Sequence, residues 1–99
     1  MKLKNKIAII TGGGKGIGKE ICLGLAKEGA KIIIADLDKE NSSIVVETII
    51  QNGGDAIYVE TNVSSEQSVK NLITKSINKF NQIDILINNA GIRLSLIHI

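Results

Sequence analysis

The sequence predicts an α/β fold in which a parallel β-sheet carries helices on both faces. Short, continuous apolar runs such as 7–10 (Ile-Ala-Ile-Ile) are typical of strands that are buried on both sides. Between these runs, apolar residues recur at helical spacing. Because each crossover between parallel strands needs a returning helix, this alternation indicates one domain built from βαβ units.

The elements are expected in the order βαβαβαβ. The predicted strands are 7–10, 31–36, 56–60 and 84–88. The third is the most polar of them, as suits an edge of the sheet. The predicted helices are 17–26, 39–52 and a third that ends at Phe80. Ser64 or Ser65 is expected to cap the third helix, and Ser64 and Gln67 have the spacing of a capping box.

Composition excludes several classes of function. The chain has 99 residues, which suits one small domain but is short for an enzyme that binds a large cofactor and a substrate together. A net charge of +2 without a basic block, together with 2% aromatic residues, favours no nucleic-acid partner. No apolar run approaches a membrane span or a signal peptide, and one cysteine fits a reducing compartment, so a cytoplasmic location is expected. No residue cluster has the spacing of a metal site.

The segment Thr11–Gly18 (TGGGKGIG) lies between the first strand and the first helix. Gly12 permits a tight turn, Gly16 lets a pyrophosphate approach the backbone, and Gly18 allows close packing of helix and sheet. The unpaired N–H groups at the helix start and the helix dipole favour an anion there. Its spacing, G-x-x-x-G-x-G, is one residue wider than the common dinucleotide fingerprint. The alternative is a glycine-rich turn without a ligand.

Asp36 ends the second strand about 20 residues after this turn. A carboxylate there can accept both hydroxyl groups of an adenosine ribose and repels a 2′-phosphate, which favours NAD over NADP. The alternative role is that of an N-cap or turn aspartate. Lys15 favours NADP instead, because a cation beside the turn would attract a 2′-phosphate. The alternative is that Lys15 is only a solvated surface charge.

Together with Asn88-Asn89-Ala90-Gly91 after the fourth strand, these motifs resemble the N-terminal part of a short-chain dehydrogenase/reductase. The resemblance extends from Lys4 to about Ile92, so residues 1–92 are expected to form part of one dinucleotide-binding domain. It implies an incomplete Rossmann-like, doubly wound sheet with strand order 3-2-1-4. It also implies that the first motif binds the cofactor phosphates and that the Asn-Asn-Ala-Gly motif supports the central sheet beside the adenosine. The alternative for the second motif is a simple turn at a strand end.

The cofactor-binding residues that follow from the motifs and the resemblance form one set. They are Gly12, Gly14, Lys15, Gly16, Ile17, Gly18, Asp36, Leu37, Asn62, Val63, Asn89, Ala90 and Gly91. One departure from the family concerns Asn62, which stands where the family usually has an aspartate near the adenine amino group. Its carbonyl can still accept that hydrogen bond, although Asn62 also suits a turn before the helix cap.

The resemblance implies hydride transfer between nicotinamide and a carbonyl or alcohol substrate, as in a 3-oxoacyl reductase or a small alcohol, sugar or steroid dehydrogenase. The complete protein, of which this chain would be the N-terminal part, is expected to be a homodimer or homotetramer. The family's catalytic Ser and Tyr-x-x-x-Lys are absent, and Tyr58, the single tyrosine, is expected to be a structural strand residue. No catalytic residue is therefore assigned. The alternatives are a non-catalytic nucleotide-binding module and an inactive fragment.

The last residues, 93–99, are expected to form a non-native tail. LSLIHI (94–99) matches the in-frame translation of CTGTCTCTTATACACATC, the transposase end sequence of a common sequencing-library adapter. The alternative is a truncated gene whose last residues form a short hydrophobic segment. Without further strands and helices, the strand at 84–88 is expected to be an exposed apolar edge.

Overall fold

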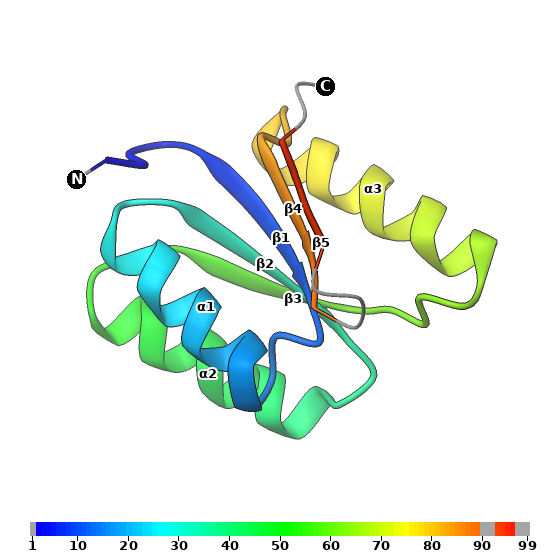
Figure 1. The fold of residues 1–99 in the computed structure, drawn as a ribbon, viewed down its shortest axis with the longest axis horizontal. Coiled ribbons are helices and arrows are strands. Elements are labelled where there is room, and N and C mark those ends of the chain that lie inside the picture. Colours follow the sequence, from blue (N-terminus) through cyan, green and yellow to red (C-terminus); the bar gives the residue numbers. More distant parts are fainter. Residues whose placement is uncertain (1, 90–92, 97–99) are drawn as a thin grey trace.

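The computed structural model describes residues 2–89 and 93–96, which form a twisted five-stranded sheet with helices on both faces (Figure 1). The elements are β1 (Ile7–Thr11), α1 (Gly16–Lys27), β2 (Lys31–Asp36), α2 (Lys39–Gln51), β3 (Ala56–Glu60), α3 (Glu66–Phe80), β4 (Ile85–Asn88) and β5 (Arg93–Leu96). The sheet order is β3-β2-β1-β4-β5, and β1 to β4 are parallel. The α/β fold and the order 3-2-1-4 are therefore confirmed.

The isoleucine-rich strands hold the layers together. In β2, Ile32 and Ile34 pack toward α1 and α2, whereas Ile33 between them packs toward α3. All three side chains are fully buried. A strand buried on both faces needs apolar residues at every position, which explains the continuous run. Each such side chain contributes about 1.5–3 kcal/mol of burial free energy.

The helix ends follow local chemistry. Asp38 caps α2 and Ser65 caps α3, and each side chain accepts a hydrogen bond from the backbone N–H three residues later. The capping box expected on Ser64 is wrong, because Ser65 is the cap. The N–H of Ser64 instead donates to the Asn62 side chain. Asn81, in the left-handed conformation, ends α3.

The fourth parallel strand is not an exposed edge, contrary to expectation. β5 pairs with β4 in the antiparallel sense, with Ile85 opposite Leu96 and Asn88 opposite Arg93. The pairing supplies main-chain partners to the edge that the sequence analysis left open. Whether residues 93–99 are native stays a prediction.

The strand register aligns the carboxyl ends of the parallel strands. At the amino end of β1, the Asp84 carboxylate accepts from the Ile7 N–H at 2.9 Å, and the Asp84 N–H donates to the Ile7 carbonyl at 2.9 Å. This reciprocal pair fixes the start of β4 beside that of β1. Consequently Thr11 lies level with both Ala35 and Asn88 at the opposite edge. The loops after β1, β2 and β4 therefore converge there.

Candidate functional site

The candidate site is a hollow at the carboxyl edge of the sheet. Its volume is about 290 Å³, and loops after β1, β2 and β3 line it. Ligands of open α/β sheets bind outside the carboxyl ends of the strands, where the strand order reverses. In this sheet the reversal lies between β1 and β4. The hollow adjoins the end of β1, one of the two strands at that reversal, and extends toward β2 and β3.

Gly12 and Gly18 bring the start of α1 against the sheet. Gly12 has φ +66°, and its N–H donates to the Ala35 carbonyl at 2.8 Å. A β-carbon at Gly18 would collide with the Gly12 carbonyl oxygen. The predicted need for glycine at both positions is therefore explained by backbone conformation at Gly12 and by close packing at Gly18.

Gly16 has a different environment from these two glycines. Its φ is +61°, and a β-carbon there would meet no atom within 4 Å. The neighbouring Ile17 side chain is 65% exposed. Packing therefore leaves the backbone at Gly16 open to an approaching group, which is what a phosphate cradle requires.

The first turn of α1 offers backbone donors without a partner from a cap. Lys15 occupies the N-cap position with extended backbone, but its side chain accepts no hydrogen bond from the helix, and the first turn has no acidic residue. The first N–H groups of a helix have no intrahelical partner, and the helix dipole makes this end positive. The turn from Gly16 to Gly18 therefore suits an anion.

Asp36 is held in place by two backbone amides. Its Oδ2 accepts from the Gly14 N–H at 3.1 Å, and its Oδ1 accepts from the Asp38 N–H at 3.1 Å. A β-carbon at Gly14 would crowd this carboxylate and the buried Ser42 hydroxyl. Asp36 thus has the turn role that the sequence analysis kept open. Each carboxylate oxygen also keeps a further lone pair for a ligand.

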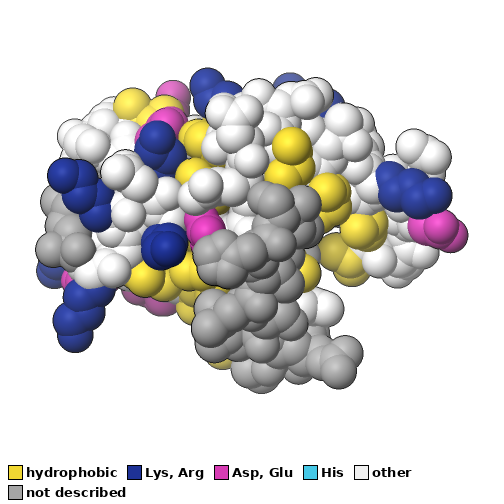
Figure 2. Space-filling model, turned by 90° about the horizontal axis from the view of Figure 1, so that it is seen from above, with side chains coloured by type: hydrophobic (Ala, Val, Ile, Leu, Met, Phe, Trp, Pro, Cys, Tyr) yellow, Lys and Arg dark blue, Asp and Glu magenta, His cyan; other side chains and the backbone are white. Residues whose placement is uncertain are grey.

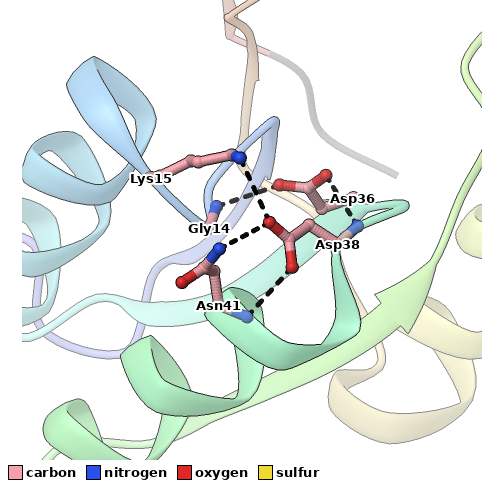
Figure 3. A network of polar contacts seen from close by, with 5 residues as sticks. All are labelled: Gly14, Lys15, Asp36, Asp38 and Asn41. Atoms are coloured by element: carbon pink, nitrogen blue, oxygen red, sulfur yellow. Dashed lines mark hydrogen bonds and ion pairs between the residues drawn. The ribbon is translucent and has the colours of Figure 1, made fainter.

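Asp38 joins the site although the sequence analysis assigned it no role. Figure 3 shows its carboxylate between the N-terminal turn of α2 and the Lys15 side chain. It accepts from the Asn41 N–H at 3.0 Å and from the Asn41 side chain at 2.6 Å, and it pairs with Lys15 Nζ at 3.4 Å. The Asn41 hydrogen bonds, with the Lys15 charge, lower the pKa of Asp38. The signal in the sequence was an aspartate directly before a predicted helix.

The hollow has apolar side chains at its rim. Leu37 is 62% exposed and Val63 is 48% exposed, and both line the hollow. Asn62 lines it as well, but its Oδ1 accepts from the Ser64 N–H at 3.0 Å and its N–H donates to Ser68 Oγ. The turn role of Asn62 is therefore present in the structure. Exposed apolar side chains at the rim of a hollow suit a flat heteroaromatic ring.

Asn88, the last residue of β4, and Asn89 attach this strand to the glycine-rich turn. Thr11 Oγ1 donates to Asn88 Oδ1 at 3.2 Å and accepts from the Asn89 N–H at 3.0 Å. Asn89 Nδ2 donates to the Gly12 carbonyl at 3.3 Å. The Asn89 side chain therefore pairs with the Gly12 backbone, whereas the Asn88 side chain pairs with the Thr11 hydroxyl. Ala90 and Gly91 lie outside the described residues.

Tyr58 and Cys22 have structural environments. The Tyr58 hydroxyl donates to the Asp36 carbonyl at 2.9 Å, and burial, with nearby acidic groups, raises the pKa of Tyr58. Burial also raises the pKa of the Cys22 thiol to about 12, so this thiol is protonated at neutral pH. Neither group is poised for acid, base or nucleophilic chemistry.

Other surfaces of the described chain offer less chemistry. A larger hollow of about 700 Å³ lies at the opposite edge of the sheet, where α1 and α2 end, so it has no free helix N–H groups. On the face seen in Figure 2, lysine and arginine side chains of the described residues lie apart and form no continuous basic surface. Within residues 2–89 and 93–96, no helix is long and apolar enough to cross a membrane, and no cluster of metal-ligating residues is found.

The residues present fit a dinucleotide. The open backbone at Gly16 suits a pyrophosphate, the fixed Asp36 carboxylate suits ribose hydroxyls, and Leu37 with Val63 suits a base. Parallel strands in the order 3-2-1-4 with this turn define a Rossmann-like nucleotide-binding protein. The family model of short chain dehydrogenases matches residues 6–98. The chain therefore belongs to the short-chain dehydrogenase family.

Known proteins resemble the chain over most of its length. It is 42% identical over 91 residues to the 7alpha-hydroxysteroid dehydrogenase of Escherichia coli K12, covering 92% of this chain and 36% of that protein. It is 42% identical to the 3-oxoacyl-[acyl-carrier-protein] reductase of Synechocystis, covering 91% and 37%. The crystal structure of 3-ketoacyl-(acyl-carrier-protein) reductase from Brucella melitensis complexed with NADH matches with a TM-score of 0.79 and 37% identity, covering 86% and 34%. The chain thus spans about a third of the length of these relatives.

Proposed function

We propose that this chain is the cofactor-binding part of an NAD(P)-dependent oxidoreductase that moves a hydride between nicotinamide and a carbonyl or alcohol substrate. The start of α1 at Gly16 carries the proposal. No side chain caps this helix start, and no atom lies within 4 Å of where a β-carbon of Gly16 would stand, so a phosphate group has both donors and space there. The nicotinamide supplies the hydride chemistry when it is bound. The residues of this chain bind and orient the adenosine and phosphate portions.

Most of the predicted residues have a place in this proposal. Gly16, Ile17 and Gly18 face the phosphates with backbone N–H groups, while the Gly14 N–H holds Asp36, which accepts hydrogen bonds from the ribose hydroxyls. Leu37 and Val63 flank the adenine, with Asn62 beside it. Asn89 and the adjoining Ala90 and Gly91 support the turn. The negative charge of Asp36 favours NAD over NADP, because a 2′-phosphate would lie against it.

Relatives named as a dehydrogenase and a reductase support the substrate class. We propose a carbonyl or alcohol of the 3-oxoacyl, steroid, small alcohol or sugar type, and a cytoplasmic homodimer or homotetramer for the complete enzyme. The alternative is a non-catalytic nucleotide-binding module, favoured by the structural hydrogen bond of Tyr58, the single tyrosine. Sequencing the gene past the codon for Gly91 discriminates between them. A Ser and a Tyr-x-x-x-Lys in the continued reading frame indicate the enzyme.

A pair of glycine substitutions tests cofactor binding. Gly16→Ala places a methyl group where the phosphate would lie, and Gly53→Ala is its control at the opposite edge of the sheet. Both glycines have positive φ, +61° and +89°, and neither β-carbon would meet an atom within 4 Å. Each substitution should lower the free energy of unfolding by about 1 kcal/mol. Only Gly16→Ala should weaken binding, by about tenfold in the dissociation constant for NAD.

Isothermal titration of the 99-residue chain with NAD measures these constants. Equal affinities of the two variants would contradict the phosphate site at Gly16. A chain that is folded by circular dichroism but binds neither NAD nor NADP would contradict the proposed function itself. Hydride transfer by the isolated chain is not expected, since it lacks the family's Tyr-x-x-x-Lys motif.

A further inference from the structure

Lys15 is the only charged residue of the segment Thr11–Gly18, yet in the structure its charge is already engaged. Its Nζ lies 3.4 Å from Asp38 Oδ2, although the Lys15 side chain is 73% exposed. Within residues 2–89 and 93–96, Asp38 is the partner in the only ion pair of Lys15. The lysine is therefore drawn across the site by the Asp38 carboxylate (Figure 3).

Asp38 is the rigid partner of this ion pair. Both its oxygens are bonded to Asn41, at 3.0 Å to the backbone N–H and at 2.6 Å to the side-chain amide. Its own N–H donates to Asp36 Oδ1. The first turn of α2 thus fixes the Asp38 carboxylate, and the flexible lysine adapts to it.

From this arrangement we propose that Asp38 is a specificity-determining residue, which neutralises Lys15 and so disfavours nucleotides that carry a 2′-phosphate. The inference rests on the proposed function, because it concerns the same nucleotide site. Asp36 and Asp38 contribute two negative charges beside the ribose position, and Lys15 contributes one positive charge, so the network has a net charge of about −1 at neutral pH. A phosphate monoester adds about −1.5 to −2 to this group.

The two aspartates act in different ways. Asp36 accepts from Gly14 and Asp38 amides, so its charge stays at the ribose whichever nucleotide binds. Asp38 acts through Lys15. The Lys15 ammonium group must break its ion pair with Asp38 before it can contact a 2′-phosphate. Asp38 is thus a positioning residue, and Lys15 is the group that would touch the ligand.

The substitution Asp38→Asn separates charge from capping. Asparagine caps helices as well as aspartate does, so the hydrogen bond from the Asn41 N–H is retained while the charge is removed. Lys15→Met removes the cation from the turn with little change in length. Glu40→Gln is the matched control, because Glu40 also lies in the first turn of α2 and is exposed, but no ion pair with Lys15 is found for it among the described residues.

The experiment measures dissociation constants of NAD and NADP for the 99-residue chain by isothermal titration at low and at physiological salt. Asp38→Asn should shift the ratio of the two constants toward NADP by about fivefold, the upper range for an exposed ion pair. The shift should shrink as salt rises. The double variant with Lys15→Met should lose it, and Glu40→Gln should leave the ratio at the wild-type value. Asp38→Ser, which also supplies a cap, should repeat the result if Asp38→Asn folds poorly.

The outcomes distinguish the two proposals. If the unaltered chain binds NAD and Asp38→Asn leaves the ratio unchanged, the role of Asp38 is overturned and the proposed function stands. If the shift persists in the double variant, Asp38 repels the nucleotide directly and masking of Lys15 is overturned. If a folded chain binds neither nucleotide, the proposed function fails, and this inference fails with it.

Discussion

The first and third helices begin at the same edge of the sheet in opposite ways. α3 has Ser65 as its N-cap, with Oγ accepting from the Ser68 N–H, and Glu66 in its first turn. α1 has Lys15 at the N-cap position, no side-chain cap and no acidic residue in its first turn. α2 resembles α3, with Asp38 as cap and Glu40 in the first turn.

The difference separates the two helix starts that the fold completes from the one that, under the proposed function, a ligand completes. A missing cap costs a helix about 1 kcal/mol. The positive φ of Gly12 in the preceding turn and of Gly16 at the first position of α1 adds to that cost. α2 and α3 satisfy the same requirement with ordinary side chains, so the proposed function, in which an anion takes the place of the cap, accounts for the open start of α1.

The largest expected effect concerns how closely α1 begins against the turn. Gly18→Ala forces a β-carbon into the Gly12 carbonyl, whereas Gly24→Ala, in the same helix, meets no atom within 4 Å. Gly18→Ala should lower the free energy of unfolding by about 2–3 kcal/mol through backbone displacement. Gly24→Ala should raise it by about 0.5–1 kcal/mol through helix propensity. Urea denaturation followed by circular dichroism measures both, and equal effects would show that the close approach at Gly18 is not required.

A smaller effect tests the helix start that is complete. Ser65→Ala removes the cap of α3 and should lower the free energy of unfolding by about 1 kcal/mol. Ser64→Ala is the control, because the Ser64 side chain is exposed and Ser65 is the cap. Neither should change the dissociation constant for NAD. A loss of NAD affinity in Ser65→Ala would mean that α3, too, contributes its start to the nucleotide site.

The strands and the glycine-rich turn could be predicted from the sequence, because local residue patterns determine them. The apolar run Ile32–Ile34 predicts a strand buried on both faces, and the structure buries it so. The glycines of the turn after β1 also have a local signature. By contrast, the choice of Ser65 over Ser64 depends on the loop before α3, where Asn62 takes the Ser64 N–H. A spacing rule for capping boxes does not include that loop.

The parts that sequence analysis missed depend on tertiary pairing. Lys15 and Asp38 are 23 positions apart and meet because β1 and β2 are adjacent and in register. The strand β5 was missed because any short apolar segment can pair with a free edge, and sequence does not reveal which edge is free. Local patterns thus identify the glycine-rich turn, whereas the side chains that lie beside it can be read only from the assembled sheet.

The smallest expected effect comes from giving α1 the cap that α3 has. Lys15→Ser places a hydroxyl at an N-cap with extended backbone, φ −159° and ψ 171°, so the Ser Oγ can accept from the Ile17 or Gly18 N–H. The free energy of unfolding should rise by about 0.5 kcal/mol, the gain of a cap less the loss of an exposed ion pair. NAD should bind several-fold more weakly, because the hydroxyl competes with the phosphate for the same amides.

Lys15→Met removes the charge without adding a cap, so only the additional loss in Lys15→Ser reports that competition. Equal NAD affinities of the two variants would show that the phosphate does not use these amides, and the contrast between α1 and α3 would then have no functional meaning.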